Sequence, residues 1–328
     1  MTSKITPSIR WGIIGCGAVT ELKSGPAYQL TKGFELIEVM RRNLELAEDY
    51  ARRHQVPRFT NNADALIEHP DIDAIYIATP PDSHKEYALK VASAGKICCI
   101  EKPIAPSYDD AEAIVSAFDK AQLPLFVAYY RRSLPRFNHV KMLLDKGQIG
   151  TPRHISWHLS KPANNLDRSG EYNWRTDSNI AKGGYFDDLA SHGLDLFAYL
   201  LGDYAEVKGF ANNQQGLYSA FDAVTACWRH TNGVTGSGSW NFGGATREDE
   251  VRIYGSKGDI RFSVFDEQDI VLTTESAQEN IWVENPKHIQ QHHVENILRQ
   301  LTNGIVHPST GVSAAHTSWV MDQILRQQ

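Results

Sequence analysis

A short glycine turn near the start of the chain has the residue types that a phosphate-binding loop needs. Residues 15–17 read Gly-Cys-Gly and follow the apolar run at residues 9–14. Glycines let the chain turn sharply and approach a pyrophosphate with no Cβ between, and the next helix adds the N–H groups and dipole of its N-terminus. Because Thr20 stands in place of the third glycine of the usual fingerprint, a turn without a ligand is the alternative. The predicted phosphate-binding residues are Gly15, Cys16, Gly17, Ala18 and Val19.

Two arginines follow the next apolar run, Phe34–Met40, where they can select between dinucleotides. Domains that bind NAD commonly carry an acidic residue at this point, which holds the ribose hydroxyls. Here the turn holds Arg41 and Arg42 and no carboxylate. A guanidinium pairs with a 2′-phosphate, whereas a carboxylate repels it. The sequence therefore favours NADP over NAD as cofactor, and a solvated surface pair of arginines is the alternative.

Lys102 is a candidate acid/base group. Hydride transfer to a carbonyl, or from an alcohol, needs a side chain that gives or takes the hydroxyl proton. Lys102 follows the apolar run at residues 96–100, and the carboxyl ends of such strands bind ligands in parallel sheets. From spacing alone, a surface lysine that ends a strand is the commoner explanation.

A second candidate group lies in the other half of the chain. Asp188 and His192 are four residues apart, which predicts that they share one face of a helix. Asp188 can fix the imidazole tautomer while His192 bonds a substrate oxygen, and Asp195 can support the ring or bind substrate hydroxyls. A capping aspartate with a buried, satisfied histidine is the structural alternative. No metal site is expected, because hydride transfer needs no Lewis acid once Lys102 is present.

The elements around these residues predict two architectures. Residues 9–128 alternate short apolar runs with helical stretches, which is typical of a parallel sheet covered on both faces. Later runs are longer and alternate apolar with polar, and Asn232-Gly233 between two of them predicts a hairpin. We expect a Rossmann domain with a doubly wound parallel sheet at residues 1–128. Residues 129–328 should form an α+β domain with a large, mainly antiparallel, open-faced sheet, whose closing helix at 312–325 is able to pack back on the first domain.

Composition excludes several classes of function. The net charge of −6 and the absence of a basic cluster argue against nucleic-acid binding. No apolar run approaches the ~18 residues of a membrane span, and the first ten residues lack a signal-peptide core, so a cytoplasmic protein is expected. The spacing of the cysteines indicates neither disulfides nor zinc, and we expect buried, reduced thiols at Cys16, Cys98, Cys99 and Cys227. The histidines expected at the surface or in an interface are His288, His292 and His293.

Over nearly its whole length the chain resembles the Gfo/Idh/MocA oxidoreductases, the glucose–fructose oxidoreductase and inositol dehydrogenase superfamily. The resemblance rests on the order and spacing of several motifs: the glycine turn, Ile77–His84, Ala94-Gly95-Lys96, Glu101-Lys102-Pro103, Asn173-Trp174-Arg175, Gly183-Gly184, Asp188 with His192 and Asp195, and Gly255–Gly258. It implies the two domains predicted above. It also implies a homodimer or homotetramer formed through the open sheet face.

The resemblance also assigns roles to residues. It places Lys102 beside the reacting carbon, with Lys102–Pro103 in the cis form, and names the lysine or the histidine as acid/base in different members. We take Lys102 as the principal group, with His192 and Asp188 completing the catalytic set. The further cofactor-binding residues are Ala78, Thr79, Pro80, Pro81, His84, Glu101, Trp174 and Arg175, with Lys102 itself. The candidate substrate-binding residues are Tyr130, Arg131, Trp174, Asp188, His192 and Asp195.

These residues together predict an NADP-preferring oxidoreductase, with NAD as the alternative cofactor. Its expected substrate is a sugar, a polyol or a related cyclic carbonyl or hydroxyl compound, because carboxylate, imidazole and indole groups suit polyhydroxylated rings. Two alternatives are a glycosidase that retains its cofactor and a non-catalytic regulator that senses a dinucleotide. The presence of both Lys102 and His192 argues against the regulator.

Overall fold

The computed structural model describes residues 8–326, and the chain divides into two compact units. Unit 1 contains the chain up to Ala105, then Asp109–Ser133 and Pro286–Ala315. Unit 2 contains Pro106–Tyr108, Leu134–Asn285 and the chain from His316 onward. Each unit is thus built from separate stretches of the chain. The domain boundary between residues 128 and 129 stays a prediction.

Unit 1 contains the predicted Rossmann sheet. Its six strands lie in the order β3-β2-β1-β4-β5-β6, and every pairing is parallel. The order reverses at β1, which pairs with both β2 and β4, and ligands bind at such a switch point in open α/β sheets. The strands are β1 (Ile9–Ile14), β2 (Phe34–Met40), β3 (Arg58–Thr60), β4 (Ala74–Ile77), β5 (Ile97–Ile100) and β6 (Leu125–Val127).

The helices of unit 1 follow the predicted alternation, with one interruption. The stretch after the glycine turn forms two short helices, α1 and α2, because Pro26 cannot continue a helix and Gly25 lies against the carbonyl of Thr20. The short elements β3 and α4 were not predicted. The helices are α1 (Ala18–Leu22), α2 (Gly25–Leu30), α3 (Leu44–His54), α4 (Ala63–Glu68), η1 (Pro81–Ser83), α5 (His84–Ser93), α6 (Tyr108–Ala121), η2 (Tyr130–Ser133) and α10 (Gln291–Asn303).

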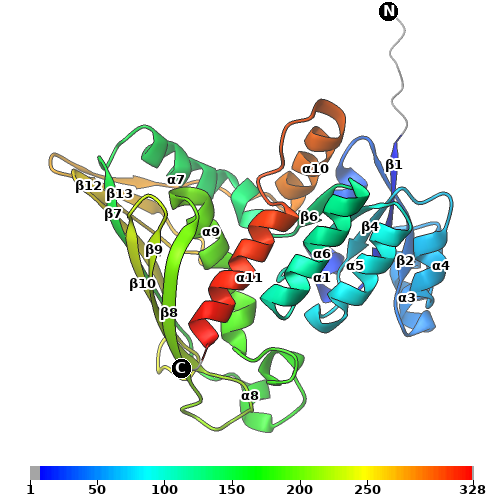
Figure 1. The fold of residues 1–328 in the computed structure, drawn as a ribbon, viewed down its shortest axis with the longest axis horizontal. Coiled ribbons are helices and arrows are strands. Elements are labelled where there is room, and N and C mark those ends of the chain that lie inside the picture. The colour runs from blue at the N-terminus through cyan, green and yellow to red at the C-terminus, as the bar shows by residue number, and fades with distance from the viewer. Residues whose placement is uncertain (1–7, 327–328) are drawn as a thin grey trace, which may run out of the picture. The chain divides into compact units, whose positions relative to one another are not determined.

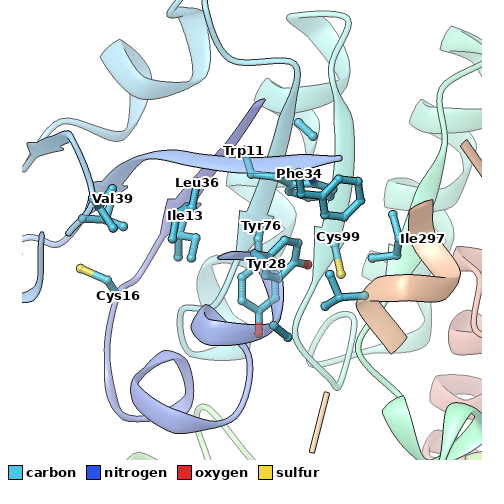
Figure 2. Close-up of a cluster of buried hydrophobic side chains, with 14 of the residues drawn as sticks. Trp11, Ile13, Cys16, Tyr28, Phe34, Leu36, Val39, Tyr76, Cys99 and Ile297 are labelled. Carbon is cyan, nitrogen blue, oxygen red and sulfur yellow. The ribbon is translucent and has the colours of Figure 1, made fainter. Parts of the chain in front are cut away.

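An aromatic cluster fills the core of unit 1 (Figure 2). The Tyr28 ring is tilted against Trp11 and stacked on Tyr76, with ring centroids 4.7 and 5.0 Å apart. Ile297 from α10 packs against this cluster, so a late segment of the chain completes the first sheet's core (Figure 1, orange helix). His293 on the same helix is fully buried beside Cys99, and its prediction as a surface or interface residue was therefore wrong.

Unit 2 contains the predicted large sheet. Its eight strands lie in the order β14-β13-β12-β11-β7-β10-β9-β8, and of the pairings of this sheet within residues 8–326 only that of β7 with β10 is parallel. Asn232-Gly233 joins β9 and β10 as the predicted hairpin, and Figure 1 shows β8, β9 and β10 side by side. The strands are β7 (Pro152–Ser160), β8 (Tyr204–Asn212), β9 (Ala223–His230), β10 (Thr235–Asn241), β11 (Glu248–Gly255), β12 (Gly258–Phe262), β13 (Ile270–Thr274) and β14 (Gln278–Ile281).

One face of this sheet packs on helices and the other is open. A Cβ on Gly193 of α9 would meet the ring of Trp157, and one on Gly209 of β8 would meet Ile324 of α11. Burial alternates along β9, which leaves Cys227 exposed, so the prediction that all four thiols are buried was wrong for Cys227. The remaining helices are α7 (Pro135–Asp145), α8 (Asn165–Ser169), η3 (Trp174–Thr176), η4 (Phe186–Ala190), α9 (Ser191–Leu201) and α11 (Gly311–Leu325), which begins in unit 1.

The fold class predicted from the sequence is confirmed: a parallel Rossmann sheet and a second, mostly antiparallel sheet. From residue 8 to residue 326, no helix combines the length and the apolar character that crossing a membrane requires.

Candidate active site

The glycine turn is tightly packed at Gly15 and open at Gly17. Gly15 has a φ of +95°, and both Gly15 and Cys16 donate backbone hydrogen bonds to the carbonyl of Met40 at 2.9 and 3.1 Å. A Cβ on Gly15 would lie 2.8 Å from the Thr79 side chain and 2.9 Å from the Ala78 backbone. A Cβ on Gly17 would meet only the Gly15 carbonyl, at 3.8 Å, within the described residues. Position 15 therefore needs glycine for packing, and position 17 is open to a pyrophosphate.

Thr20 gives this turn a support that the glycine fingerprint lacks. Its hydroxyl donates to the carbonyl of Gly17 at 2.8 Å, and Tyr50 donates to the carbonyl of Thr20 at 2.9 Å. Helix α1 has only five residues, so its dipole is weaker than that of a long helix after the turn would be. The turn is thus held by side-chain hydrogen bonds.

Three loops lie side by side at the carboxyl edge of the sheet. Ala78 donates to the carbonyl of Ile14, and Glu101 donates to the carbonyl of Ile77, both at 2.8 Å. These bonds join the ends of β1, β4 and β5 in that order. The glycine turn, the Thr79 loop (Ala78–Pro81) and the lysine loop (Glu101–Ala105) therefore occupy neighbouring positions at one edge, as the sequence predicted.

A buried carboxylate fixes the backbone of the lysine loop. Glu101 Oε1 accepts from the Tyr76 hydroxyl at 2.6 Å and from Gln290 Nε2 at 2.7 Å, while Oε2 accepts from the Lys102 amide at 3.1 Å. The Lys102–Pro103 peptide bond is cis, as the resemblance implied. Tyr76 and Gln290 were not predicted as site residues. Gln290 lies 189 residues from Glu101, and no local pattern marks it.

His84 lies beneath these loops. Its side chain is fully buried, and Nε2 lies 2.8 Å from the Thr79 carbonyl while Nδ1 lies 3.0 Å from the Pro103 carbonyl. Burial lowers the pKa of His84, and the carbonyl contacts and the charge of Glu101 oppose this shift. The ring therefore faces protein backbone on both edges, and a contact of His84 with the cofactor stays a prediction.

In unit 2, an ion pair orders the region of the predicted catalytic helix. Arg175 Nε donates to Asp188 Oδ2 at 2.9 Å, and the Arg175 guanidinium lies 4.4 Å from the centre of the Trp174 ring. The single α-helix expected to carry Asp188 and His192 is instead a π-helical turn, η4, followed by α9. Asp188 lies on the turn and His192 on the first turn of α9, so the simple four-residue spacing of an α-helix does not apply.

His192 and Asp195 are both buried in unit 2. The His192 and Phe265 rings form a T-shaped pair with centroids 5.9 Å apart, and Thr317 donates to Asp195 Oδ1 at 3.2 Å. Tyr130 and Arg131 are buried in η2 of unit 1, where the guanidinium lies 5.0 Å from the centre of the tyrosine ring. Because Lys102 belongs to unit 1 and His192 to unit 2, their convergence stays a prediction.

Comparisons with known proteins match both units. The family model of an oxidoreductase family with an NAD-binding Rossmann fold, Gfo/Idh/MocA, matches residues 9–129, and the model of the Gfo/Idh/MocA C-terminal domain matches residues 137–261. The chain belongs to the Gfo/Idh/MocA oxidoreductase family. The resemblance seen in the sequence is thereby confirmed, and the protein is an oxidoreductase.

Individual relatives agree with this assignment. Oxidoreductase P35 of Formosa agariphila is 38% identical, and the match covers 96% of this chain and 97% of that protein. Levoglucosan dehydrogenase of Pseudarthrobacter phenanthrenivorans is 28% identical over 67% of this chain and 63% of its own length. A solved levoglucosan dehydrogenase in complex with NADH and levoglucosan shares the fold, with a TM-score of 0.86, 22% identity, and coverage of 97% of this chain and 96% of that one.

This oxidoreductase carries a polar cluster that the sequence analysis missed. Tyr185 donates to Asp167 at 2.5 Å and accepts from Asn164 and Asn173, while Lys161 Nζ lies 4.6 Å from the centre of the tyrosine ring. Burial raises the pKa of Tyr185 to about 12 and lowers the pKa of Lys161. The members lie on separate loops and helices, so no periodic pattern signals them. Within residues 8–326, no three His, Cys, Asp or Glu side chains are grouped as metal ligands would be.

Asp187 should make the stability of the protein depend on pH. Burial, together with the charges of Asp322 and Asp188, raises its pKa from 3.8 to about 7, while the Gly183 amide donates to its carboxylate at 2.8 Å. The native state therefore holds a proton that the unfolded state releases, so the free energy of unfolding should fall as pH rises from 4 to 7. The full shift corresponds to about 4 kcal/mol, and we expect less because the side chain is only partly buried.

Asp187→Asn tests this expectation, because asparagine still accepts the hydrogen bond from Gly183. Urea unfolding at a series of pH values should show a flatter profile for the variant, with a gain in stability over the wild type near pH 8 and little difference near pH 4. Asp203→Asn, which changes an exposed carboxylate of the same unit, is the control and should keep the wild-type slope. Parallel profiles for wild type and Asp187→Asn would contradict the assignment.

Proposed function

We propose that this chain is an NADP-preferring oxidoreductase that interconverts an alcohol and a carbonyl group on a sugar, a polyol or a related cyclic compound. The observation that carries the proposal is the row of three loops at one sheet edge, in which the Thr79 loop lies between the glycine turn and the lysine loop. The residues at the glycine turn fit a dinucleotide, because position 17 is open and position 15 accepts no side chain. A bound nicotinamide dinucleotide supplies or accepts the hydride.

The protein's own residues bind the substrate and move its proton. Lys102, with its backbone held by Glu101, donates a proton to the substrate oxygen in reduction and takes it back in oxidation. His192 hydrogen-bonds the same substrate oxygen. Asp188, which is paired with Arg175, orients the polar groups around that oxygen. Of the residues predicted from the sequence, those that hold the dinucleotide directly are the glycine turn, Arg41, Arg42, the Thr79 loop, Glu101, Trp174 and Arg175.

Two observations support a sugar-like substrate. One relative is a levoglucosan dehydrogenase, three solved structures of the same fold are of levoglucosan dehydrogenase, and levoglucosan is bound in one of them. In this chain, unit 2 gathers carboxylate, amide, ammonium and indole groups near Asp188 and Tyr185, and such groups bind hydroxyls and the apolar face of a ring. We infer that the substrate is a polyhydroxylated ring.

A substrate panel tests the proposal. The purified protein is mixed with NADP⁺ or NAD⁺ and with levoglucosan, L-sorbose, inositols and common aldoses, and the absorbance of the reduced cofactor is followed. Net reduction with at least one ring compound is expected. Release of an aryl group from an aryl glycoside without net change in the cofactor would favour the glycosidase, and binding of cofactor without turnover of any compound would favour the regulator.

Arg41 and Arg42 should set the preference for NADP. Arg41 Nη1 lies 3.5 Å from the carbonyl of Cys16, so its guanidinium lies at the glycine turn, and Arg42 is exposed beside it. Losing charge-assisted hydrogen bonds of about 1.5–3 kcal/mol should raise KM for NADP roughly tenfold to a hundredfold in Arg41→Ala/Arg42→Ala, with KM for NAD within about threefold of wild type. Steady-state kinetics with both cofactors measures this.

Arg52→Ala provides the control, because this exposed arginine of α3 pairs with Asp49 and lies outside the predicted phosphate site. Its two KM values should match the wild type. A wild-type enzyme that prefers NAD, or a double variant that loses both cofactors equally, would overturn the assignment of these arginines.

The open sheet face supports a proposal about assembly. The outward positions of β9 hold Thr225, Cys227 and Arg229, which are exposed in the single chain, and a second copy would cover them. We infer a homodimer or homotetramer through this face. The four cysteines are all unpaired, which supports a reducing compartment such as the cytoplasm.

A further inference from the structure

His84 connects the two loops that flank the proposed nicotinamide site. It is the first residue of α5, and its ring lies between the Thr79 loop and the lysine loop. One edge presents Nε2 to the carbonyl of Thr79 at 2.8 Å. The other presents Nδ1 to the carbonyls of Pro103 and Ile104 at 3.0 and 3.3 Å. The side chain is fully buried, so this arrangement is an internal contact and not a surface site.

We propose that His84 is a positioning residue that holds both loops, with its Nε2 edge fixing the Thr79 loop for the cofactor and its Nδ1 edge fixing the lysine loop for proton transfer. This proposal rests on the proposed function. In this proposal His84 does not contact the cofactor directly, although the resemblance had implied such a contact. The residue acts through the backbone of its neighbours.

The chemistry of the ring explains why histidine suits this position. A backbone carbonyl only accepts hydrogen bonds, so each of the two edges stabilises its loop by donating an N–H. Because acceptors face both edges, donation at both requires the protonated ring. Burial lowers the pKa of His84, while the carbonyl contacts and the charge of Glu101 favour the protonated form, so the hold on both loops is strongest at low pH. The lysine loop has a second support, because Glu101 accepts from the Lys102 amide, but the Pro103 and Ile104 carbonyls meet the His84 ring. Losing the Nδ1 edge should therefore let the segment after Lys102 shift.

Asparagine and glutamine separate the two edges. The amide nitrogen of asparagine occupies roughly the place of Nδ1, and that of glutamine roughly the place of Nε2. His84→Asn should therefore keep the bond to Pro103 and lose the bond to Thr79, and His84→Gln should do the reverse. His84→Phe fills the space and donates to neither. Each variant thus removes one named hydrogen bond, or both, from a ring-sized site.

The experiment measures the two loops independently. The dissociation constants of NADPH and NADH are measured by fluorescence without substrate, and kcat is measured with a sugar that the panel shows to be turned over. We expect Phe and Asn to weaken cofactor binding by about threefold to tenfold, the effect of one hydrogen bond, and Gln to restore it. We expect Phe and Gln to lower kcat by roughly tenfold to a hundredfold, because a small displacement of an acid/base group is costly, and Asn to restore it.

Amide hydrogen exchange reports the same division without any substrate. In His84→Gln the amides of Lys102, Ile104 and Ala105 should exchange faster than in wild type, and in His84→Asn the amides of Ala78 and Thr79 should. His307→Phe is the matched control, since His307 is buried in the same unit and its ring faces the carbonyls of His293 and Ser309, which belong to neither loop. It should lose stability but keep cofactor affinity and kcat.

Two results would overturn the proposal. One is a folded His84→Phe variant with cofactor affinity, kcat and loop exchange within about twofold of wild type. The other is a set of variants in which Asn and Gln behave alike, because simple packing predicts no difference between them. If no sugar is turned over, the proposed function fails, while cofactor affinity and amide exchange still decide the role of His84.

Discussion

Lys102→Met is expected to lower kcat by about 10²- to 10⁴-fold, the usual contribution of a positioned acid/base group. Methionine keeps the length of the side chain and removes the ammonium, so the loop and its bond to Glu101 should persist. The dissociation constant of NADPH should therefore stay within a few-fold of wild type. Steady-state kinetics with an active sugar, combined with cofactor titration, measures both quantities.

Lys96→Met is the matched control for this variant. Lys96 precedes β5 and Lys102 follows it, so the two lysines lie at opposite ends of one strand. The Lys96 ammonium donates to the carbonyl of His69 at 2.6 Å, and its loss should lower the melting temperature without changing kcat. A Lys102→Met enzyme with near-normal turnover, or equal losses of kcat in both variants, would remove Lys102 from the reaction.

The cofactor half of the site could be predicted from the sequence because its parts are local. The glycine turn, Thr79 and Lys102 each follow an apolar strand directly, and parallel strands bring their carboxyl ends to one edge. Strand type and loop position were therefore enough to place three loops together. The same reasoning gave the antiparallel sheet, since Asn232-Gly233 fixes a hairpin and the alternation along β9 fixes its faces.

The residues that support the cofactor half of the site could not be predicted, because they come from distant segments of the chain. Gln290 reaches Glu101 across 189 residues, and His293 is buried because α10 packs on the core of unit 1. A helix rich in polar residues is expected to lie at the surface when its packing partner is unknown. His84 was predicted as a cofactor-binding residue, but its contacts with two loops were not predicted, since its acceptors are backbone carbonyls and leave no trace in residue types.

The substrate half was less accessible to sequence reasoning. The spacing of Asp188 and His192 suggested one α-helix, but a π-helical turn ends between them, and the extra residue per turn changes which side chains share a face. Arg175, predicted to lie near the cofactor, pairs with Asp188. Such a pair depends on how η3 and η4 fold against each other, and spacing does not encode that.

His192→Ala is expected to lower kcat by about a hundredfold or more, because it removes the proposed partner of Lys102 at the substrate oxygen. His192 is buried, and its ring packs on Phe265, so its removal also leaves a cavity and some loss of stability is expected. His230→Gln is the control, since His230 is equally buried in unit 2 beside the carbonyl of Gly202. It should lose stability with kcat unchanged.

The double variant Lys102→Met/His192→Ala tests whether the two groups meet at one proton, although they belong to separate units. Residues that act as a unit give strongly non-additive effects, so the double variant should be little slower than the slower single variant. Independent roles would instead multiply the two losses of kcat. A multiplicative result with normal cofactor binding would mean that lysine and histidine serve different steps, and the shared proton-transfer role would have to be abandoned.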